Sequence, residues 1–276
     1  SIKMIAACCD QAGERYGKKS GERIGLIADV QRASIHDGSG FRTTVFFKGC
    51  PLKCAWCHNP ECISFEKQTL FYPEKCIGCG QCEKGCFTGA RVICGKEYSV
   101  EALLEEILQD KDYYGNEGGV TFSGGEPLAQ RKFLSKVIDA CHSAGVLCSV
   151  ETSLIFYEEE IFKKLDLVMA DLKIWDDELH RLYTGVSNQA IKENFKKLNC
   201  LGIPIIARTP VMMEIEQGVD KISAFLKELE NVRKYELLPY HPLGNSKQEA
   251  LGKAVVQFQK PDKEFMKRLN QYVFAR

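Results

Sequence analysis

Apolar, β-branched runs alternate with helical patterns along most of the chain. Six short runs predict strands, at 43–47, 119–123, 146–150, 166–170, 203–208 and 235–238. Apolar residues recur at helical spacing in four other stretches: Val100–Leu108 after Ser99, Leu134–Cys141 before Gly145, Asp220–Leu229, and Phe265–Leu269 after Pro261 and Asp262. Alternating βα units indicate a parallel sheet. Six units are too few for a closed eight-stranded barrel, so we predict an α/β fold, an open partial (β/α)6 barrel.

Distinctive residues follow five of these six strands. They are Gly49-Cys50, the run from Ser123 to Pro127, Glu151-Thr152-Ser153, Asp171-Leu172-Lys173 and Pro239-Tyr240-His241. Each segment alone is compatible with an ordinary polar loop. Because the carboxyl ends of parallel strands meet at one edge of a sheet, we expect the five segments to form one site there.

Three cysteines follow the first strand in a C-x-x-x-C-x-x-C arrangement, Cys50, Cys54 and Cys57. Three thiolates holding an iron-sulfur cube leave one iron without a protein ligand, free to be chelated by an amino group and a carboxylate. This is the arrangement of a radical S-adenosylmethionine (SAM) enzyme, in which the reduced cube cleaves SAM to a 5′-deoxyadenosyl radical. A structural zinc site or buried thiols are the alternatives, but zinc requires a fourth ligand and His58 is poorly placed to be one.

The segment from Ser123 to Glu126 carries paired glycines, Gly124 and Gly125. Glycines let a backbone approach a ligand closely, and an ammonium group needs the acceptors that such a backbone exposes. Glu126 could supply a charged acceptor, or it could simply favour the start of a helix at Pro127.

A second cysteine motif lies between the first two strands: Cys76, Cys79, Cys82 and Cys86 have the spacing of a bacterial ferredoxin. Phe87 replaces the usual proline, so the fourth ligand of a [4Fe-4S] cluster is Cys86, Cys94 or, at greater distance, Cys62. A zinc knuckle is the alternative. Residues 61–97 contain few apolar residues, so we predict a small inserted ferredoxin-like module that its cluster folds.

Composition supports one principal domain, since 276 residues with 45% hydrophobic content suffice for one large core. We expect an N-terminal extension (1–24), a barrel formed by 25–60 and 98–276, and the insert between them. Lys plus Arg equals Asp plus Glu at 37 each, which disfavours nucleic acid and anionic membranes as partners. The 14 cysteines, with no leader and no bilayer-length apolar run, indicate reduced thiols in the cytoplasm. No surplus apolar stripe is evident, so we expect a monomer.

The chain resembles the glycyl-radical-enzyme activating enzymes, relatives of pyruvate formate-lyase activase. The resemblance is carried by the segments Ser34–Thr43, Phe46–Glu61, Val120–Pro127, Asp171–Lys173 and Leu237–His241. It implies that the deoxyadenosyl radical removes hydrogen from a backbone glycine of a partner glycyl radical enzyme, under anaerobic conditions. It further implies a reductant of the flavodoxin or ferredoxin type.

The resemblance also assigns residues. Cys50, Cys54 and Cys57 would hold the catalytic cluster, and SAM would contact Trp56, Ser123, Gly124, Gly125, Glu126, Glu151, Thr152, Lys173, Arg208 and His241. Glu151, Asp171 and the backbone at Leu238 resemble a monovalent-cation site, and Asp37 matches a position that meets the partner's glycine loop.

Departures from the family pattern are Ser39 in place of proline, Leu154 in place of glycine, and one ferredoxin motif where most insert-bearing relatives have two. The auxiliary cluster is expected to relay electrons, with docking of a partner as the alternative. A radical SAM enzyme acting on a small molecule or another peptide is the second hypothesis for the chain. A non-catalytic electron carrier is the third, although it leaves the barrel unexplained.

Overall fold

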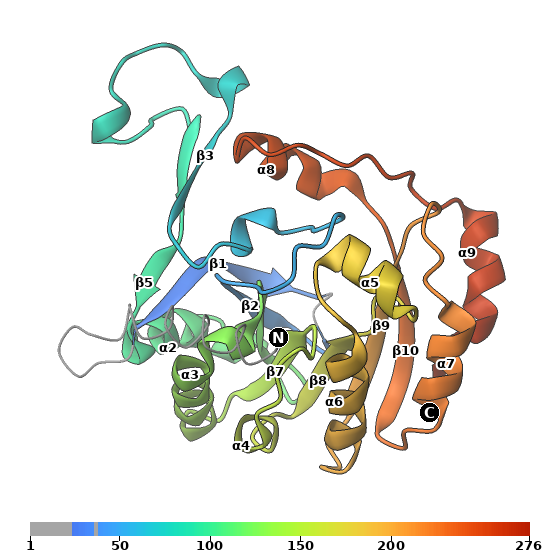
Figure 1. Cartoon of the computed structure of the whole chain (residues 1–276). Coiled ribbons are helices and arrows are strands. Elements are labelled where there is room, and N and C mark those ends of the chain that lie inside the picture. The colour runs from blue at the N-terminus through green and yellow to red at the C-terminus, as the bar shows by residue number, and fades with distance from the viewer. Residues whose placement is uncertain (1–23, 36–37) are drawn as a thin grey trace.

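The computed structural model describes residues 24–35 and 38–276. Asp37 and the predicted N-terminal extension, apart from its last residue, lie outside the described residues. Within them the main sheet has nine strands in the order β11-β10-β9-β8-β7-β6-β2-β1-β5 (Figure 1). Its six central strands are parallel, and their order in the sheet follows their order in the chain: β2 (Arg42–Phe47), β6 (Gly119–Gly124), β7 (Leu147–Thr152), β8 (Leu167–Asp171), β9 (Ile205–Val211) and β10 (Val232–Pro239).

These six strands confirm the predicted open α/β barrel. Antiparallel strands extend both edges: β1 (Gly25–Ser34) and β5 (Lys96–Tyr98) beside β2, and β11 (Phe274–Ala275) beside β10. The hydropathy pattern did not predict these three strands.

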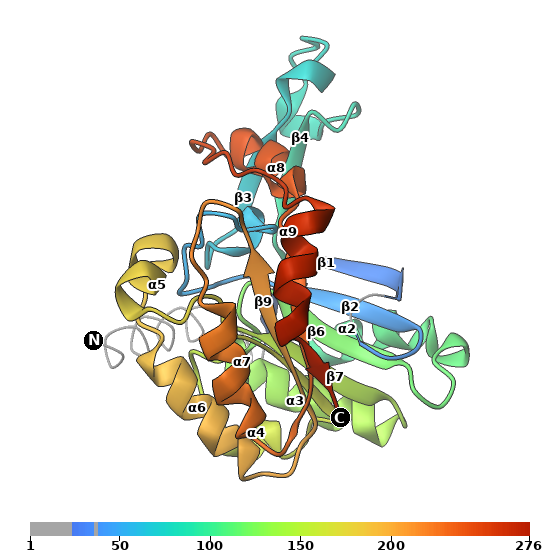
Figure 2. The same cartoon turned by 90° about the vertical axis from the view of Figure 1, so that its right-hand side faces the viewer.

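Helices cover the outer face of the parallel strands (Figures 1 and 2). They are α2 (Val100–Leu108), α3 (Arg131–Ser143), α4 (Glu159–Phe162), α6 (Gln189–Asn199) and α7 (Val219–Lys227). Three further helices lie elsewhere: α5 (Asp177–Thr184) at the carboxyl-terminal end of the strands, α8 (Asn245–Ala250) beside residues 68–71, and α9 (Lys263–Leu269) near the end of the chain. Short 3-10 turns lie at Pro60–Cys62, Pro73–Lys75, Cys82–Lys84, Lys111–Tyr113, Pro127–Gln130, Pro242–Gly244 and Asn270–Tyr272. The predicted helix starts at Ser99 and Asp262 are capped, since these side chains accept the amides of Ala102 and Phe265. None of the described helices is both long and apolar enough to span a bilayer.

The core lies between the sheet and these helices. Phe122 of β6 and Val150 of β7 are fully buried and belong to the same apolar cluster as Leu134 and Ile138 of α3. Each of these strands carries buried apolar residues, which is why the hydropathy pattern located them.

Arg42 links three strands at their amino-terminal ends. Its buried guanidinium donates to Thr121 Oγ1 (2.7 Å), Val120 O (2.8 Å) and Ser149 Oγ (2.8 Å). The carboxyl ends of the strands lie at the opposite end of the sheet.

The predicted insert forms a separate hairpin of β3 (Gln68–Phe71) and β4 (Arg91–Cys94). It projects from the main sheet and α8 packs beside it (Figures 1 and 2). The last residues of the predicted insert, from Lys96, already belong to β5 of the main sheet.

Candidate functional site

A cavity of about 310 Å³ opens at the carboxyl ends of the parallel strands. Residues from all five segments predicted to converge line it, together with Arg208 and Pro210 of β9 and Met212 after it. Its walls include Cys50, Cys54, Trp56, Cys57, Ser123, Gly124, Gly125, Glu151, Thr152, Asp171, Lys173, Arg208, Leu238 and His241. The expected convergence at one edge of the sheet is therefore found.

The three cysteines that follow β2 lie on one wall of this cavity. Burial raises the pKa of Cys50 well above that of a free thiol, and Glu126 and the neighbouring thiols raise it further. Burial likewise raises the pKa of Cys54, and it raises that of Cys57 to about 12. These thiols are protonated at neutral pH, so a metal group binding there must displace their protons.

In residues 24–35 and 38–276, no three His, Cys, Asp or Glu side chains converge tightly enough to ligate a single metal ion. Cys50, Cys54 and Cys57 instead border a common cavity. Three soft thiol donors around such a space fit an iron-sulfur cube, which is larger than one ion.

The paired glycines are required by the protein's own backbone. A Cβ at Gly124, whose φ is +102°, would lie 2.5 Å from Phe47 N. A Cβ at Gly125 would lie 2.5 Å from Cys62 O and 2.6 Å from Gly49 O. This glycine pair therefore lets the end of β6 pack directly against the loop that carries the cysteines.

Glu126 differs from the other predicted SAM contacts, because it is fully buried and does not line the cavity. Its carboxylate accepts from Thr152 Oγ1 (2.8 Å), Ser153 Oγ (2.6 Å) and Ser153 N (2.9 Å), and it caps the following turn at Leu128 N. The predicted direct contact with an ammonium group is therefore not supported by this placement. Glu126 instead ties β7 to the glycine segment.

Two ion pairs form the charged wall of the cavity. Lys173 Nζ lies 2.5 Å from Asp171 Oδ2, and Arg208 Nη1 lies 2.5 Å from Glu151 Oε1. Ser123 Oγ donates to the other oxygen of Glu151 at 2.5 Å. The two pairs are neighbours, because Asp171 of β8 lies directly opposite Arg208 of β9 in the strand register.

Trp56 occupies the aromatic side of the cavity. Its ring packs against Tyr183 of α5 and edge-on against Phe258, which also contacts Tyr240. The segment between α8 and α9 therefore reaches the site through Phe258.

The cavity residues that the sequence did not place in the site include His58, Asn59 and Met212. His58 and Asn59 directly follow Cys57, so their position next to a recognised motif was the available signal. Ser153 and Tyr240 belong to segments that were expected to converge, although no role was predicted for either side chain. Burial, followed by the nearby charge of Lys247, lowers the pKa of His58.

The cysteines of the insert fall into two groups. Cys76, Cys79 and Cys82 are exposed in the segment that joins β3 to β4, and Cys86 of the same segment is half-buried. Cys94 instead ends β4 and is buried at the base of the hairpin.

The base of the hairpin is held by a buried lysine. Lys48 Nζ donates to Glu61 O at 2.6 Å and lies 4.0 Å from Cys94 Sγ. Cys62, the residue after Glu61, is buried there as well. Cys62 and Cys94 therefore belong to the packing between the insert and the barrel.

The sequence matches the family model of the Radical SAM superfamily over residues 44–226. Among solved structures, QueE from Escherichia coli aligns with a TM-score of 0.50 at 18% identity, covering 83% of this chain and 90% of that one. SuiB from Streptococcus suis, bound to its precursor peptide SuiA, aligns with a TM-score of 0.57 at 16% identity, covering 81% and 42%. The fold and the site thus define a protein of the radical SAM class.

Sequence relatives narrow this class. The trans-4-hydroxy-L-proline dehydratase activating enzyme of Clostridioides difficile is 36% identical, over 89% of this chain and 95% of the relative. The (2S)-3-sulfopropanediol dehydratase activating enzyme of Klebsiella oxytoca is 37% identical, over 83% and 86%. The chain belongs to the glycyl-radical-enzyme activating enzymes of the Radical SAM superfamily, which confirms the resemblance drawn from the sequence.

Proposed function

We propose that this chain cleaves SAM reductively and abstracts a hydrogen atom from a backbone glycine of a partner glycyl radical enzyme. The products are methionine, 5′-deoxyadenosine and a glycyl radical stored on the partner. One observation carries the proposal: three cysteine thiols and two partly buried cation-carboxylate pairs line the same cavity. An iron-sulfur cube at the thiols would supply the electron that breaks the carbon-sulfur bond of SAM.

The roles of the chain's own residues follow from their chemistry. Cys50, Cys54 and Cys57 hold the cube, and Trp56 offers an aromatic face to the nucleoside. Gly124 and Gly125 carry backbone groups to the cavity for the methionyl ammonium, beside Ser123 and Thr152.

Lys173 and Arg208 supply positive charge for the SAM carboxylate, with His241 on the same cavity. In the structure Lys173 pairs with Asp171, and Arg208 pairs with Glu151. When the two cations turn toward the SAM carboxylate, they release Asp171 and Glu151. A monovalent cation held by Glu151, Asp171 and the carbonyl of Leu238 would then balance the freed negative charge.

A second [4Fe-4S] cluster is proposed at Cys76, Cys79, Cys82 and Cys86. The supporting observation is a segment without a core, in which Ile77 is 71% and Phe87 is 101% exposed. A segment of this kind gains order from a bound metal group. Cys86 is favoured over Cys94 and Cys62, because the latter two are buried at the base of the hairpin.

We assign the second cluster the role of an electron relay from a flavodoxin or ferredoxin. The Cys79→Ala variant should then lose activation with that protein donor while keeping activation by dithionite. Equal activity with both donors and unchanged partner binding would leave the insert a structural module. We propose that the protein works in an anaerobic cytoplasm, where such clusters can function. We also propose that it acts as a monomer.

The central test is spectroscopic. Reconstituted under anaerobic conditions and reduced, the chain should show a cluster electron paramagnetic resonance (EPR) signal that changes on addition of SAM. The Cys57→Ala variant should lose this signal while keeping that of the insert. Incubation with SAM, reductant and a candidate glycyl radical enzyme should then yield a glycyl doublet. A wild-type cluster indifferent to SAM would contradict the proposal.

A further inference from the structure

The last turn of α5 supports the cysteine loop through the backbone. Thr184 O accepts the amide of Lys53 at 2.8 Å, and Tyr183 O accepts the amide of Ala55 at 2.9 Å. These two amides flank Cys54 on either side. The position of Cys54 therefore depends on where α5 ends.

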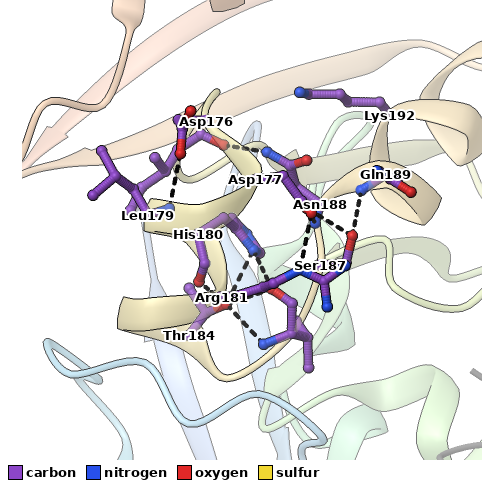
Figure 3. Close-up of polar contacts among 12 residues, drawn as sticks. Asp176, Asp177, Leu179, His180, Arg181, Thr184, Ser187, Asn188, Gln189 and Lys192 are labelled. Atoms are coloured by element: carbon purple, nitrogen blue, oxygen red, sulfur yellow. Dashed lines mark hydrogen bonds and ion pairs between the residues drawn. The ribbon is translucent and has the colours of Figure 1, made fainter. Parts of the chain in front are cut away.

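His180 fixes that end of α5. Its Nδ1 lies 2.7 Å from Val186 O and 3.1 Å from Thr184 Oγ1, and the Thr184 hydroxyl donates to His180 O at 2.7 Å (Figure 3). A carbonyl accepts only, so Nδ1 carries the proton. Both side chains are fully buried, and the helix ends at Gly185 with φ +80°.

The turn after α5 is anchored as well. The carboxylate of Asp177 accepts from Ser187 Oγ (2.6 Å) and from Asn188 N (2.8 Å) (Figure 3). Asn188 Nδ2 donates at 2.8 Å to the carbonyls of Ile174 and Trp175, just beyond β8. The platform on which the cysteine loop rests is thus tied to the same strand end as Lys173.

The backbone amides on either side of Cys54 are potential hydrogen-bond donors to the sulfurs of a cluster held there. The amides of Lys53 and Ala55 are engaged by α5 and are withheld from the sulfurs.

Hydrogen bonds to the sulfurs of an iron-sulfur cluster raise its reduction potential, because they stabilise the additional negative charge of the reduced state. Withholding two amides therefore favours a low potential. A low potential is what reduction of a sulfonium requires.

We propose that His180 is a positioning residue that keeps the reduction potential of the catalytic cluster low by holding the last turn of α5 on the Lys53 and Ala55 amides. This inference rests on the proposed cluster at Cys50, Cys54 and Cys57. It assigns no contact between His180 and SAM, and it accounts for a buried histidine that the proposed chemistry does not use.

The test compares three reconstituted variants with wild type. His180→Leu fills the site without a donor, His180→Asn places an amide donor near the position of Nδ1, and His142→Leu removes an exposed histidine of α3 as a control. The midpoint potential is measured by EPR-monitored titration, and hydrogen exchange is followed in the peptide spanning 52–56.

His180→Leu should exchange faster in that peptide, shift the potential upward and cleave SAM about tenfold more slowly. A tenfold change in a one-electron equilibrium corresponds to about 59 mV. His180→Asn and His142→Leu should match wild type. If His180→Leu does not accumulate as folded protein, Thr184→Val carries the same expectation.

An unshifted potential in a folded variant with faster exchange would overturn the inference, as would a shift that His180→Asn fails to restore. Absence of a SAM-responsive cluster in wild type would instead overturn the proposed function. The two failures are therefore distinguishable.

Discussion

Lys173 and Asp171 form an ion pair at the carboxyl end of β8, with Nζ 2.5 Å from Oδ2. The lysine side chain is only 11% exposed. Burial alone would lower the pKa of Lys173, but Asp171 and the thiols of Cys54 and Cys50 outweigh it and raise that pKa. The ammonium therefore stays charged beside the cysteine loop, ready to receive a carboxylate.

Replacing this lysine should weaken SAM binding selectively. Lys173→Met removes a charged hydrogen-bond donor worth about 1.5–3 kcal/mol, which corresponds to roughly 10- to 100-fold in the dissociation constant of SAM. Equilibrium binding to the reconstituted protein measures the effect. Lys53→Met, an exposed lysine of the cysteine loop, is the matched control and should bind SAM as wild type does. If the two variants bind SAM with equal affinity, Lys173 does not contribute to the binding site.

The sequence could predict the six parallel strands because each contains a short run of apolar and β-branched residues. It could not reveal α5 in the same way, since the buried positions of α5 are His180 and Thr184. Their burial depends on hydrogen bonds within the folded turn, which hydropathy does not register. Helix α6 was overlooked although Ile191, Phe195 and Leu198 follow helical spacing.

The residues of the site also divide into those that the sequence could predict and those that it could not. Strand ends identified most of the cavity residues, because the parallel topology brings such ends together. The actual partners of Glu126 are set by packing between β6 and β7, and no local pattern encodes them. The insert was recognisable from cysteine spacing, whereas the burial of Cys94 beside Lys48 required the hairpin register.

Glu126 should give the apoprotein a characteristic dependence of stability on pH. Burial raises the pKa of Glu126 above its ordinary 4.5, only partly offset by the hydrogen bonds from Ser153 and Thr152. Between 4.5 and the raised pKa, the folded state binds more protons than the unfolded state, so this group makes the free energy of unfolding fall as pH rises. Urea denaturation across this range should show the fall in wild type and its absence in Glu126→Gln. Parallel curves for the two proteins would contradict the assignment.

Gly125→Ala should disturb both stability and SAM binding. The added methyl group would meet two backbone oxygens, of Cys62 and Gly49, which cannot move without shifting the cysteine loop. Overpacking of this kind costs about 1–3 kcal/mol. Gly145→Ala is the control, because its Cβ meets no atom within 4 Å and only its φ of +72° is unfavourable, at about 1–2 kcal/mol. The stability of both variants is measured by urea denaturation, and their affinity for SAM by equilibrium binding. Both should lose stability, but only Gly125→Ala should lose affinity for SAM.

The fourth ligand of the insert cluster can be determined by iron content. Wild type should hold about eight iron atoms per chain, from two four-iron clusters. Cys86→Ala should retain about four, because it removes a ligand from the exposed segment, whereas Cys94→Ala and Cys62→Ala should retain about eight. Cys200→Ala replaces an exposed cysteine after α6 and is the control for incidental loss of iron during reconstitution. Should Cys94→Ala lose iron while Cys86→Ala keeps it, the base of the hairpin must open to bind the cluster, and Lys48 would lose its sulfur neighbour.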